Sequence, residues 1–598
     1  MSETNTVPGR IEALRRQMQK ENLDAYFIFG TDPHMSEYVA HRWHDRAWIS
    51  GFTGSAGVVV VTAGSAGLWT DSRYHLQAEE QLRGSGIELF REGVPGVLSI
   101  DEWLAKELPA AASAGADAWT LSLSRQRSLK SSLARFGILF RSTPDLLDRI
   151  WTDRPEMPAR PIYQHDTKYA GQSRGEKLGR LRRELQNLKA DYQLISSLSD
   201  IAWLFNLRGS DIDYNPLFIS YALISSEKAY LALQRKSLSD ELASLLEEEG
   251  VTLAAYDQIA GLLREVLDKD QRLIFDPDMV NTGLSEILHA SCFPIERRDI
   301  TSGLKSIKGG TEIEGIRKAM IKDGVAMVRF IHWLQHSWER AELTEISIGA
   351  ALEQFRSEQA GFIGESFHPI VGFRDHGAVI HYSADENSSY RVDQPGLLLV
   401  DSGGHYLDGT TDITRTIALG EPSSQQQEDY TTVLKGHIEL AMARFPKGTR
   451  GVQLDALAKR PCWERGMHYA HGTGHGVGYF LNVHEGPQSI SPRMIDIPVE
   501  PGMLCSNEPG VYREGQYGIR IENLVLVKEQ FSTPFGTFLG FETVTLCPFD
   551  RSLINPGMLS TDQLRWVNEY HSTVFNALSP LLSREEQRWL GEVTAPLS

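Results

Sequence analysis

The chain has 598 residues, too many for one hydrophobic core, so we expect roughly two to four domains. Its 41% hydrophobic and 23% charged residues are typical of a globular protein. A net charge of −18 argues against nucleic acid as a partner, because a phosphate-binding surface needs a basic face.

The N-terminal segment "MSETNTVPGR" is polar and lacks the apolar core of a signal peptide. No stretch approaches the ~18 uninterrupted apolar residues of a membrane span. The cysteines are scattered without a CxxC pair, which indicates a reduced compartment and neither structural disulfides nor a thiolate zinc site. We therefore expect a cytoplasmic enzyme or binding protein that does not enter a membrane.

The front half of the chain contains an internal repeat. The segment "DRAWISGFTGS" (45–55) reappears as "DIAWLFNLRGS" (200–210). Upstream, "LRRQMQKENLDA" from Leu14 has a counterpart in "LRRELQNLKA" from Leu181. Both copies are expected to run from a helix to a strand and then to a turn that ends in Gly-Ser. Two matches in the same order favour a duplication over chance similarity.

Each copy begins with an amphipathic helix. The first has apolar residues three and four apart, and the second repeats this spacing behind a Ser173–Glu176 capping box. These apolar residues are Ile11, Leu14 and Met18 in the first copy, and Leu178, Leu181, Leu185 and Leu188 in the second.

Strand candidates follow the helices, at 25–29 and 57–64 in the first copy and at 229–233 in the second. Alternating helix and strand signals predict two α/β domains, at 1–160 and 161–300. The proline-bearing stretch "RPEMPARPIY" (154–163) is the expected linker.

A third domain is predicted at 301–545, followed by a C-terminal extension at 546–598. Thr311, with Glu314 three residues later, is the expected cap of its first helix. The apolar face of that helix would contain Ile313, Ile316 and Met320. In the extension, 564–578 and 585–590 have helical patterns.

The third domain contains an ordered set of acids and histidines. His381 closes an apolar, strand-like run in "GAVIHYSA", and Asp401 and Asp412 stand on either side of a Gly-rich turn. His475, Glu508 and Glu522 follow in "HGTGHGVG", "CSNEPGVY" and "GIRIENLVLV".

Two of these carboxylates lie in apolar segments that folding would bury, Asp401 after "GLLLV" and Glu522 within "IRIENLVLV". A buried carboxylate is costly unless it is paired or binds a cation. One such acid is most often a structural residue, but four together with an imidazole favour a metal cluster. Such a set can bridge two divalent ions ~3.5–4 Å apart, as in hydrolases. Without a thiolate it favours Mn²⁺, Co²⁺ or Zn²⁺.

Residue spacing indicates which side chains share a face. Residues two apart in a strand point to the same side, so Arg520 is expected beside Glu522, and Thr414 beside Asp412. Four glycines disfavour a helix through "HGTGHGVG". An extended segment would place its two histidines, His471 and His475, on one face, one as a ligand and the other as its support.

Seven residues and their motifs resemble the aminopeptidase P (Xaa-Pro aminopeptidase) family, whose pita-bread fold is shared with methionine aminopeptidase and prolidase. The motifs are "DGTTDITRT", "GHGVGYFLNVHEGP", "NEPGVY" and "GIRIENLVLV", and the residues are His381, Asp401, Asp412, His475, His484, Glu508 and Glu522. "SEYVAHRWHDRAWISGFTGSAG" and "LWTDSRYHLQAEEQL" look like the first domain of the long, three-domain form. The resemblance implies two creatinase-like N-terminal α/β domains before an α+β catalytic domain.

The resemblance implies two divalent metal ions, Mn²⁺ as the first choice and Zn²⁺ or Co²⁺ as alternatives. Asp401 and Asp412 would hold and bridge the metals. His475 and Glu508 would complete the shell of one metal, and Glu522 would bridge both.

The resemblance also assigns roles around the metals. Glu508 would be the general base, and His381 and His484 would bind the scissile peptide and help to transfer protons. Arg520 would support the ligands, as would His471, and Arg73 of "TDSRY" would reach the substrate from the first domain.

The activity implied is release of the N-terminal residue from peptides with proline in the second position, through attack of a metal-activated water. A prolidase-like Xaa-Pro dipeptidase is an alternative, although prolidases usually lack the middle domain. A non-catalytic pita-bread binding protein is another, although such relatives have typically lost metal ligands. Members of the long form are commonly dimers, so a homodimer is expected, with the apolar C-terminal region as its contact.

Three residues near the motifs have no assigned role. His376 in "RDHGAVIHY" stands where the family often has Asn, and His368 is an additional histidine. A lone additional histidine is more often structural or at the surface than functional. Glu485 would stabilise His484 or its loop.

Overall fold

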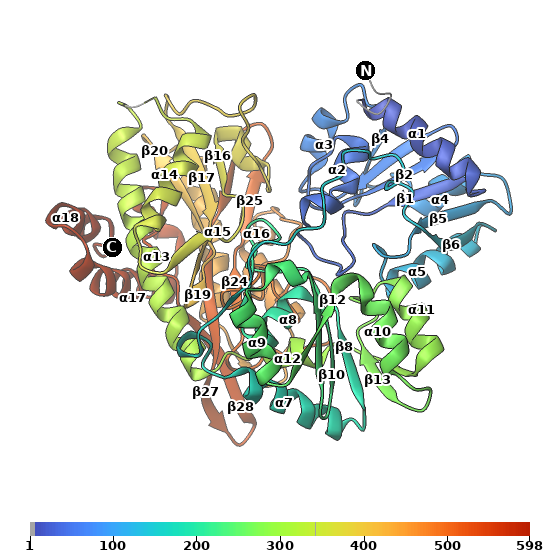
Figure 1. Ribbon diagram of the computed structural model, residues 1–598. Helices are drawn as coiled ribbons and strands as arrows, with labels where there is room; N and C mark the ends of the chain where they lie inside the picture. The colour runs from blue at the N-terminus through green and yellow to red at the C-terminus, as the bar shows by residue number, and fades with distance from the viewer. Residues whose placement is uncertain (1–5, 341) are drawn as a thin grey trace. The chain divides into compact units, whose positions relative to one another are not determined.

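The computed structural model describes residues 6–340 and 342–598 and contains two compact units (Figure 1). The first unit comprises Met1–Gln164 and Gln172–Thr301, and the second comprises His165–Gly171 and Ser302–Ser598. Within the described ranges, no helix combines the length and the apolar character that crossing a membrane requires.

The first unit contains two six-stranded sheets with equivalent strand orders, β4-β3-β2-β1-β5-β6 and β12-β11-β10-β8-β13-β14. The first sheet consists of β1 (Ala25–Ile28), β2 (Val58–Thr62), β3 (Ala66–Thr70), β4 (Glu88–Arg91), β5 (Ser113–Asp117) and β6 (Leu139–Thr143). The second consists of β8 (Tyr192–Ile195), β10 (Ser220–Ser225), β11 (Ala229–Leu233), β12 (Val251–Ala255), β13 (Arg272–Phe275) and β14 (Phe293–Glu296). In both sheets the central strand, β1 or β8, pairs antiparallel on one side and parallel on the other. The duplication predicted from the sequence is therefore confirmed in the fold.

The repeated Trp-containing segments are helical, which the sequence did not predict. They form α2 (Asp45–Ser50) and α8 (Leu198–Phe205), each of which ends at a residue in the left-handed conformation. Gly51 at φ 80° ends α2, and Asn206 at φ 50° ends α8, because these residue types tolerate positive φ. The Gly-Ser turn follows each helix.

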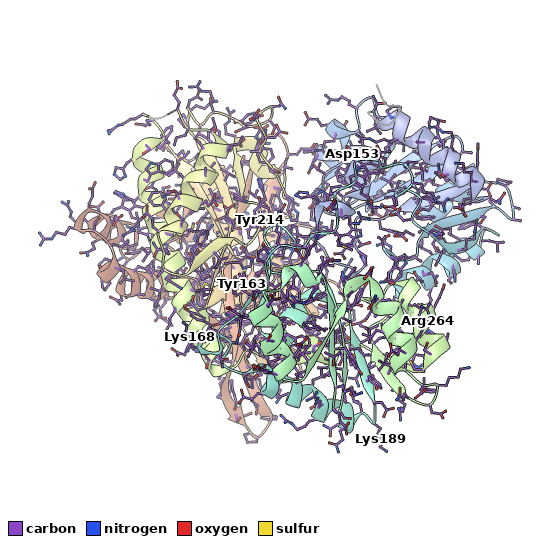
Figure 2. All side chains as sticks on the ribbon, viewed as in Figure 1. Asp153, Tyr163, Lys168, Lys189, Tyr214 and Arg264 are labelled. Carbon is purple, nitrogen blue, oxygen red and sulfur yellow. The ribbon has the colours of Figure 1, made fainter. Side chains whose placement is uncertain are left out.

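The predicted amphipathic helices are α1 (Val7–Lys20) and α7 (Arg174–Asn187). The capping box before α7 is present, since the backbone N–H of Ser173 donates to Glu176 Oε2 at 2.7 Å. Further helices of this unit are α3 (His75–Gln81), α4 (Ile100–Glu107), α5 (Leu123–Ala134), α9 (Asp240–Glu248), α10 (Ile259–Val266) and α11 (Thr282–Ser291). Of these, α10 is clearly amphipathic, since it buries Leu263 and exposes Arg264, which is labelled in Figure 2.

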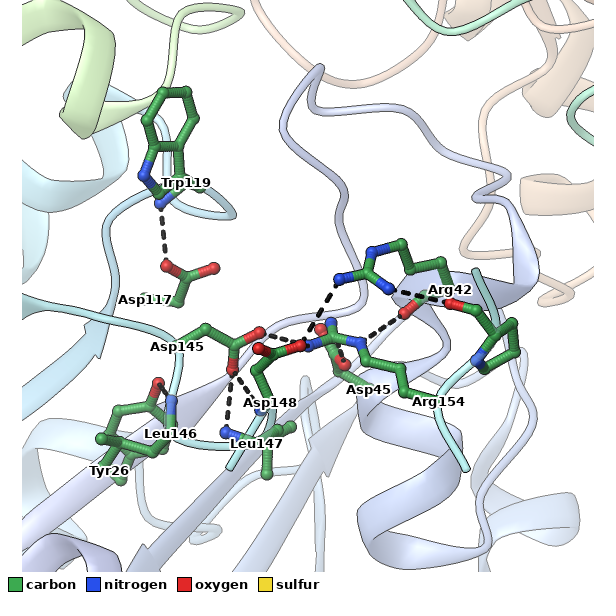
Figure 3. Close-up of polar contacts among 11 residues, drawn as sticks. Tyr26, Arg42, Asp45, Asp117, Trp119, Asp145, Leu146, Leu147, Asp148 and Arg154 are labelled. Carbon is green, nitrogen blue, oxygen red and sulfur yellow. Dashed lines mark hydrogen bonds and ion pairs between the residues drawn. The ribbon is translucent and has the colours of Figure 1, made fainter. Parts of the chain in front are cut away.

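The predicted linker 154–163 is anchored to the first copy at its first residue. Arg154 Nη2 forms an ion pair with Asp45 Oδ1 at 2.8 Å, and its Nε donates to the carbonyl of Arg42 at 2.9 Å (Figure 3). The Arg154 side chain is only 5% exposed. Because the ion pair is buried, removing either partner would leave an uncompensated charge in the interior.

The second unit is built from short antiparallel sheets and long helices. One sheet has the order β16-β17-β20 and another β21-β28-β27-β24. Their strands are β16 (Ile370–Phe373), β17 (Gly396–Ser402), β20 (Ile413–Leu419), β21 (Arg444–Pro446), β24 (Leu504–Asn507), β27 (Asn523–Thr533) and β28 (Gly536–Thr543). The other sheets of this unit contain β15 (Phe362–Glu365), β18 (Gly404–Tyr406), β19 (Gly409–Thr410), β22 (Gly474–His475), β23 (Ser489–Ile490), β25 (Gly510–Arg513) and β26 (Tyr517–Arg520).

The longer helices of this unit are α13 (Gly310–Ser337), α14 (Glu345–Ser357), α15 (Ser424–Ala441), α16 (Gly451–Trp463), α17 (Thr561–Leu578) and α18 (Arg584–Val593). The C-terminal α17 and α18 both contact α13 (Figure 1). Val567 and Leu590 belong to the same buried core as Phe330 of α13 and Leu398 of β17. The extension therefore completes the core of this unit.

The cap predicted for α13 is wrong. The helix begins at Gly310, and the N–H of Gly309 donates to Glu312 Oε2 at 2.8 Å. Glu312 occupies the third helical position, whereas Glu314 lies beyond the first turn and pairs with Arg317 at 3.3 Å. The acid of the capping box is therefore Glu312, three residues after the cap residue Gly309.

Candidate metal centre

Strand pairing brings three of the predicted ligands to one place. Asp401 lies near the end of β17, where it pairs in register with Thr414 of β20. Asp412 immediately precedes β20. Glu522 is held here as well, since its N–H donates to the Thr414 carbonyl at 3.1 Å and its Oε2 accepts from Thr414 Oγ1 at 2.7 Å. The β17–β20 pair is therefore the base on which the carboxylates converge.

The continuous strand predicted through "GIRIENLVLV" is interrupted. β26 ends at Arg520 and β27 begins at Asn523, so Glu522 lies between two strands that belong to different sheets. Arg520 and Glu522 nevertheless face one point, because Arg520 Nε donates to the same Thr414 hydroxyl at 3.3 Å. The expected shared face is confirmed, although not through one regular strand.

The glycine-rich loop delivers His475 to this point. A Cβ at Gly474 would lie 2.0 Å from the Ser506 carbonyl oxygen, and one at Gly476 would lie 2.0 Å from that of Glu485. Only glycine permits such approach, so the backbone of the loop passes directly against its neighbours. His475 then stands 3.3 Å from Asp412 Oδ2, measured from its Nε2.

The ligand atoms form a tight group. One atom from each of Asp412, His475 and Glu522 lies within 4.8 Å of the other two. Glu508 joins them, because its Oε1 is 3.5 Å from His475 Nε2 and its N–H donates to the Thr473 carbonyl at 2.7 Å. His475 donates its Nδ1–H to the Gly476 carbonyl at 3.0 Å, which directs Nε2 toward the carboxylates, as in histidines that bind metals.

Negative charge dominates the group. Burial raises the pKa of Glu508 to about 7, with a contribution from the charge of Asp412. Burial and the neighbouring carboxylates likewise raise the pKa of Glu522 well above its usual range, and burial raises that of Asp401. For His475, burial lowers the pKa, but the hydrogen bond to Asp412 and the charge of Glu508 outweigh it and raise the pKa to about 9. A cation would relieve this repulsion.

The donor set fits divalent metal ions. Asp401 Oδ1 and Glu522 Oε1 are buried, and neither accepts a hydrogen bond from any residue that the structure describes. A buried carboxylate oxygen without a donor is costly, and a divalent cation is a partner that satisfies it. Carboxylate and imidazole donors without a thiolate suit Mn²⁺, Co²⁺ and Zn²⁺.

A chain of hydrogen bonds supports Asp401 from behind. Arg520 Nη2 is 2.5 Å from Asp401 Oδ2, and Arg520 Nη1 donates to the Tyr512 hydroxyl at 2.9 Å. That hydroxyl donates to His471 Nε2 at 2.9 Å, since His471 Nδ1 already donates to the Gly472 carbonyl. His471 thus reaches the group through Tyr512, a residue that the sequence did not single out.

His484 and Glu485, adjacent residues of the "VHEGP" motif, contact different parts of the protein. The His484 ring packs edge-on against His475, with ring centroids 4.3 Å apart. Glu485 instead forms ion pairs with Lys305 at 3.1 Å and Lys308 at 2.9 Å. Burial raises the pKa of Glu485, but the two lysines outweigh it and lower the pKa. Glu485 is therefore a structural residue of the loop.

His381 lies in a turn, so the predicted strand is wrong there. β16 ends at Phe373, and Arg374–Ala378 form a short 3₁₀ helix. A Cβ on Gly518 would lie 1.6 Å from the Gly377 carbonyl oxygen, so this segment packs on the backbone of β26 instead of extending a sheet. Arg520 Nη2 lies 3.4 Å from the carbonyl of Ile380, next to His381.

Arg73 belongs to the first unit. Its Nε and Nη2 donate to the two carboxylate oxygens of Asp71 at 2.8 and 2.7 Å. This bidentate pair fixes the guanidinium within its own domain.

Comparison with known proteins identifies the family. A model of the creatinase/prolidase N-terminal domain matches residues 10–149, a second of the same description matches 153–312, metallopeptidase family M24 matches 314–529, and the C-terminal region of peptidase M24 matches 537–597. The probable Xaa-Pro aminopeptidase P of Coprinopsis cinerea is 40% identical, over 98% of this chain and 98% of its own length. The chain belongs to the Xaa-Pro aminopeptidase P family.

Two further proteins match almost the whole of this chain. Aminopeptidase P2 of Arabidopsis thaliana is 39% identical, over 99% of this chain and 89% of its own length. The crystal structure of X-prolyl aminopeptidase from Caenorhabditis elegans matches with a TM-score of 0.94 and 31% identity, covering 99% of this chain and 100% of that one. The latter is described as a cytosolic enzyme with a di-nuclear active site. An enzyme of the Xaa-Pro aminopeptidase P family, with two creatinase-like domains before a pita-bread domain, is thus confirmed.

Proposed function

We propose that this protein is a metal-dependent aminopeptidase that releases the first residue from peptides with proline in the second position. The observation that carries the proposal is the group of four carboxylates around His475, three of them buried, in a chain that matches Xaa-Pro aminopeptidases over almost its whole length.

Five residues would hold two divalent ions: Asp401, Asp412, His475, Glu508 and Glu522. The uncompensated negative charge and the two carboxylate oxygens without a donor support this set. The chemistry that two such ions supply when bound is a lower pKa for water and polarisation of a carbonyl oxygen. Mn²⁺ is our first choice, with Zn²⁺ and Co²⁺ as alternatives, because the donors are oxygen-rich and include no thiolate.

The side chains of the protein would move the protons and orient the peptide. Glu508 Oε1, 3.5 Å from His475 Nε2, accepts a proton from the attacking water and passes it to the leaving nitrogen. His484, packed against His475, and His381 donate hydrogen bonds to the scissile peptide. Arg520 and His471 keep Asp401 in place through Tyr512.

Proline in the second position explains why histidine donors are needed. The scissile bond is then a tertiary amide that has no N–H, so the enzyme cannot orient it through that group. Contacts with the carbonyl and with the first residue must do so instead. We include Arg73 among these substrate contacts, as the family resemblance implies.

We further propose a cytoplasmic homodimer, with domains at 1–160, 161–300 and 301–545 and an extension at 546–598. The cytosolic location stated for the Caenorhabditis elegans enzyme supports the first point.

The test uses chelator-treated protein with and without added Mn²⁺, incubated with Xaa-Pro, Xaa-Pro-Pro-Xaa and Xaa-Ala-Pro-Xaa peptides. Mass spectrometry should show Mn²⁺-dependent loss of only the first residue from the longer peptide with proline second. Cleavage limited to the dipeptide would identify a prolidase instead. An absence of cleavage with Mn²⁺, Co²⁺ or Zn²⁺ would refute catalysis and favour a binding role.

A further inference from the structure

The turn that carries His381 is held on both sides. Before it, the Ile380 carbonyl accepts from Arg520, the residue that supports Asp401. After it, the Tyr382 hydroxyl donates to Glu345 Oε2 at 2.9 Å. His381 therefore lies between one contact to the candidate metal centre and one to α14.

Glu345 is the centre of the second attachment. It is 1% exposed and lies at the first position of α14, where the helix dipole favours a negative charge. Besides Tyr382, its carboxylate accepts from the N–H groups of Phe373 at 2.7 Å and Tyr390 at 2.8 Å. It also accepts from His376 Nδ1 at 2.9 Å. A buried carboxylate with four donors is a rigid anchor, because losing any one donor leaves a charge poorly compensated.

His376 locks the segment to this anchor. Its ring stacks on Tyr390 with centroids 3.5 Å apart and on Tyr382 with centroids 4.3 Å apart. The imidazole thus packs against two tyrosines that follow His381 in the chain, while Nδ1 binds Glu345. Its side chain is 16% exposed, unlike that of His368, which lies on the surface.

We propose that His376 and Glu345 are positioning residues for the reaction: they fix the turn so that His381 is held in its working orientation before the peptide arrives. The inference rests on the proposed function, in which His381 contacts the substrate. Its physical basis is that a pre-ordered donor loses less entropy when the substrate binds, and that a small displacement of a catalytic group is costly.

The first experiment compares His376→Ala with His376→Asn in the full-length, Mn²⁺-loaded protein. The alanine variant should lose about 10- to 100-fold in kcat/KM while retaining its bound metal. The asparagine variant should recover part of this loss, because its amide can donate near the position of Nδ1. His368→Ala, an exposed histidine earlier in the chain, is the matched control and should match the parent.

Two further readouts separate positioning from a general structural role. Combined with His381→Ala, the His376→Ala change should cost nothing more, because it acts only through His381. Hydrogen exchange of the peptide covering 377–390, measured without substrate, should become faster in His376→Ala and stay unchanged in His368→Ala. If His376→Ala fails to fold, Tyr382→Phe removes only the hydroxyl and should show the same effects on a smaller scale.

Additive losses in the double variant, or an unchanged exchange rate, would overturn the inference. So would a His376→Ala enzyme as active as the parent. If the parent itself cleaves none of the Xaa-Pro peptides, the proposed function fails first, and the exchange experiment still reports whether the anchor exists.

Discussion

In the second unit, the single acid Glu485 and the group of acids around His475 differ in how their negative charge is compensated. Glu485 has two lysine partners, both almost fully buried, and its pKa is lowered. Near His475, the pKa values of Glu508, Glu522 and Asp401 are raised, because burial and mutual repulsion exceed what nearby cationic side chains offset. An acid whose charge is neutralised by lysines of the same chain is structural, whereas a group of acids with uncompensated negative charge favours the binding of cations from solution. Charge compensation therefore separates Glu485 from the ligands, although it adjoins His484.

The largest effect is expected for Asp412→Asn. An amide in place of a carboxylate removes one charge from the centre of the group, so metal content should fall and activity should drop by roughly 1,000-fold or more. Metal analysis and peptide cleavage check this. The control is Glu485→Gln, which should keep its metal. Full metal occupancy in Asp412→Asn would show that charge compensation does not distinguish Glu485 from the metal ligands.

Glu485→Gln should instead reduce stability. Lys305 and Lys308 would be left buried without a counter-charge, which costs about 3–5 kcal/mol of unfolding free energy. Denaturant unfolding of the metal-loaded protein measures the loss. Adding Lys305→Met to the variant should restore part of it. A variant with parental stability would mean that the lysines do not depend on Glu485.

His484→Ala should slow turnover by about 100-fold while both metals stay bound, because His484 contacts His475 without belonging to the carboxylate group. Peptide kinetics and metal analysis on the same sample test this. Loss of metal from this variant would show that His484 is a metal ligand, contrary to our assignment.

The smallest expected effect is the change in the unfolding free energy of the metal-free protein with pH. Folding raises the pKa of Glu508 from 4.5 to about 7, so between these pH values the folded protein binds more protons than the unfolded protein. The free energy of unfolding therefore falls as the pH rises through this range. His475, raised to about 9 from 6.5, contributes stability that is complete below pH 6.5 and lost toward pH 9. Each proton contributes at most ~1.4 kcal/mol per pH unit. Unfolding of chelator-treated protein should therefore be easiest at high pH, and Mn²⁺ should stabilise it most there. Metal-free stability that rises over this range would contradict the assignment.

The sequence was most informative where ligands lie at strand ends. Asp401 follows an apolar run that must be a buried strand, and Asp412 lies two residues from Thr414, so their convergence follows from strand geometry. The duplicated sheets were equally accessible, because the repeat preserved its order. Such features depend on local patterns that tertiary contacts did not change.

Contacts between distant segments were not predictable. The hydrogen bond from Arg520 to Tyr512 depends on the pairing of β25 with β26. The turn at His381 arises because Gly377 and Gly518, far apart in sequence, pack backbone to backbone. The lysine partners of Glu485 come from residues before α13. In each case a remote neighbour, absent from the motif, decided the outcome.

The packing of α17 and α18 has a consequence for synthesis on the ribosome. Val574 and Leu597 share one core with Phe330, so that core stays incomplete until the last part of the chain has emerged. Each sheet of the first unit, by contrast, draws its strands from one continuous stretch of sequence and can pair while translation continues. A chain truncated after residue 545 would thus leave the hydrophobic core of the second unit incomplete and exposed, which makes it a substrate for chaperones and proteases.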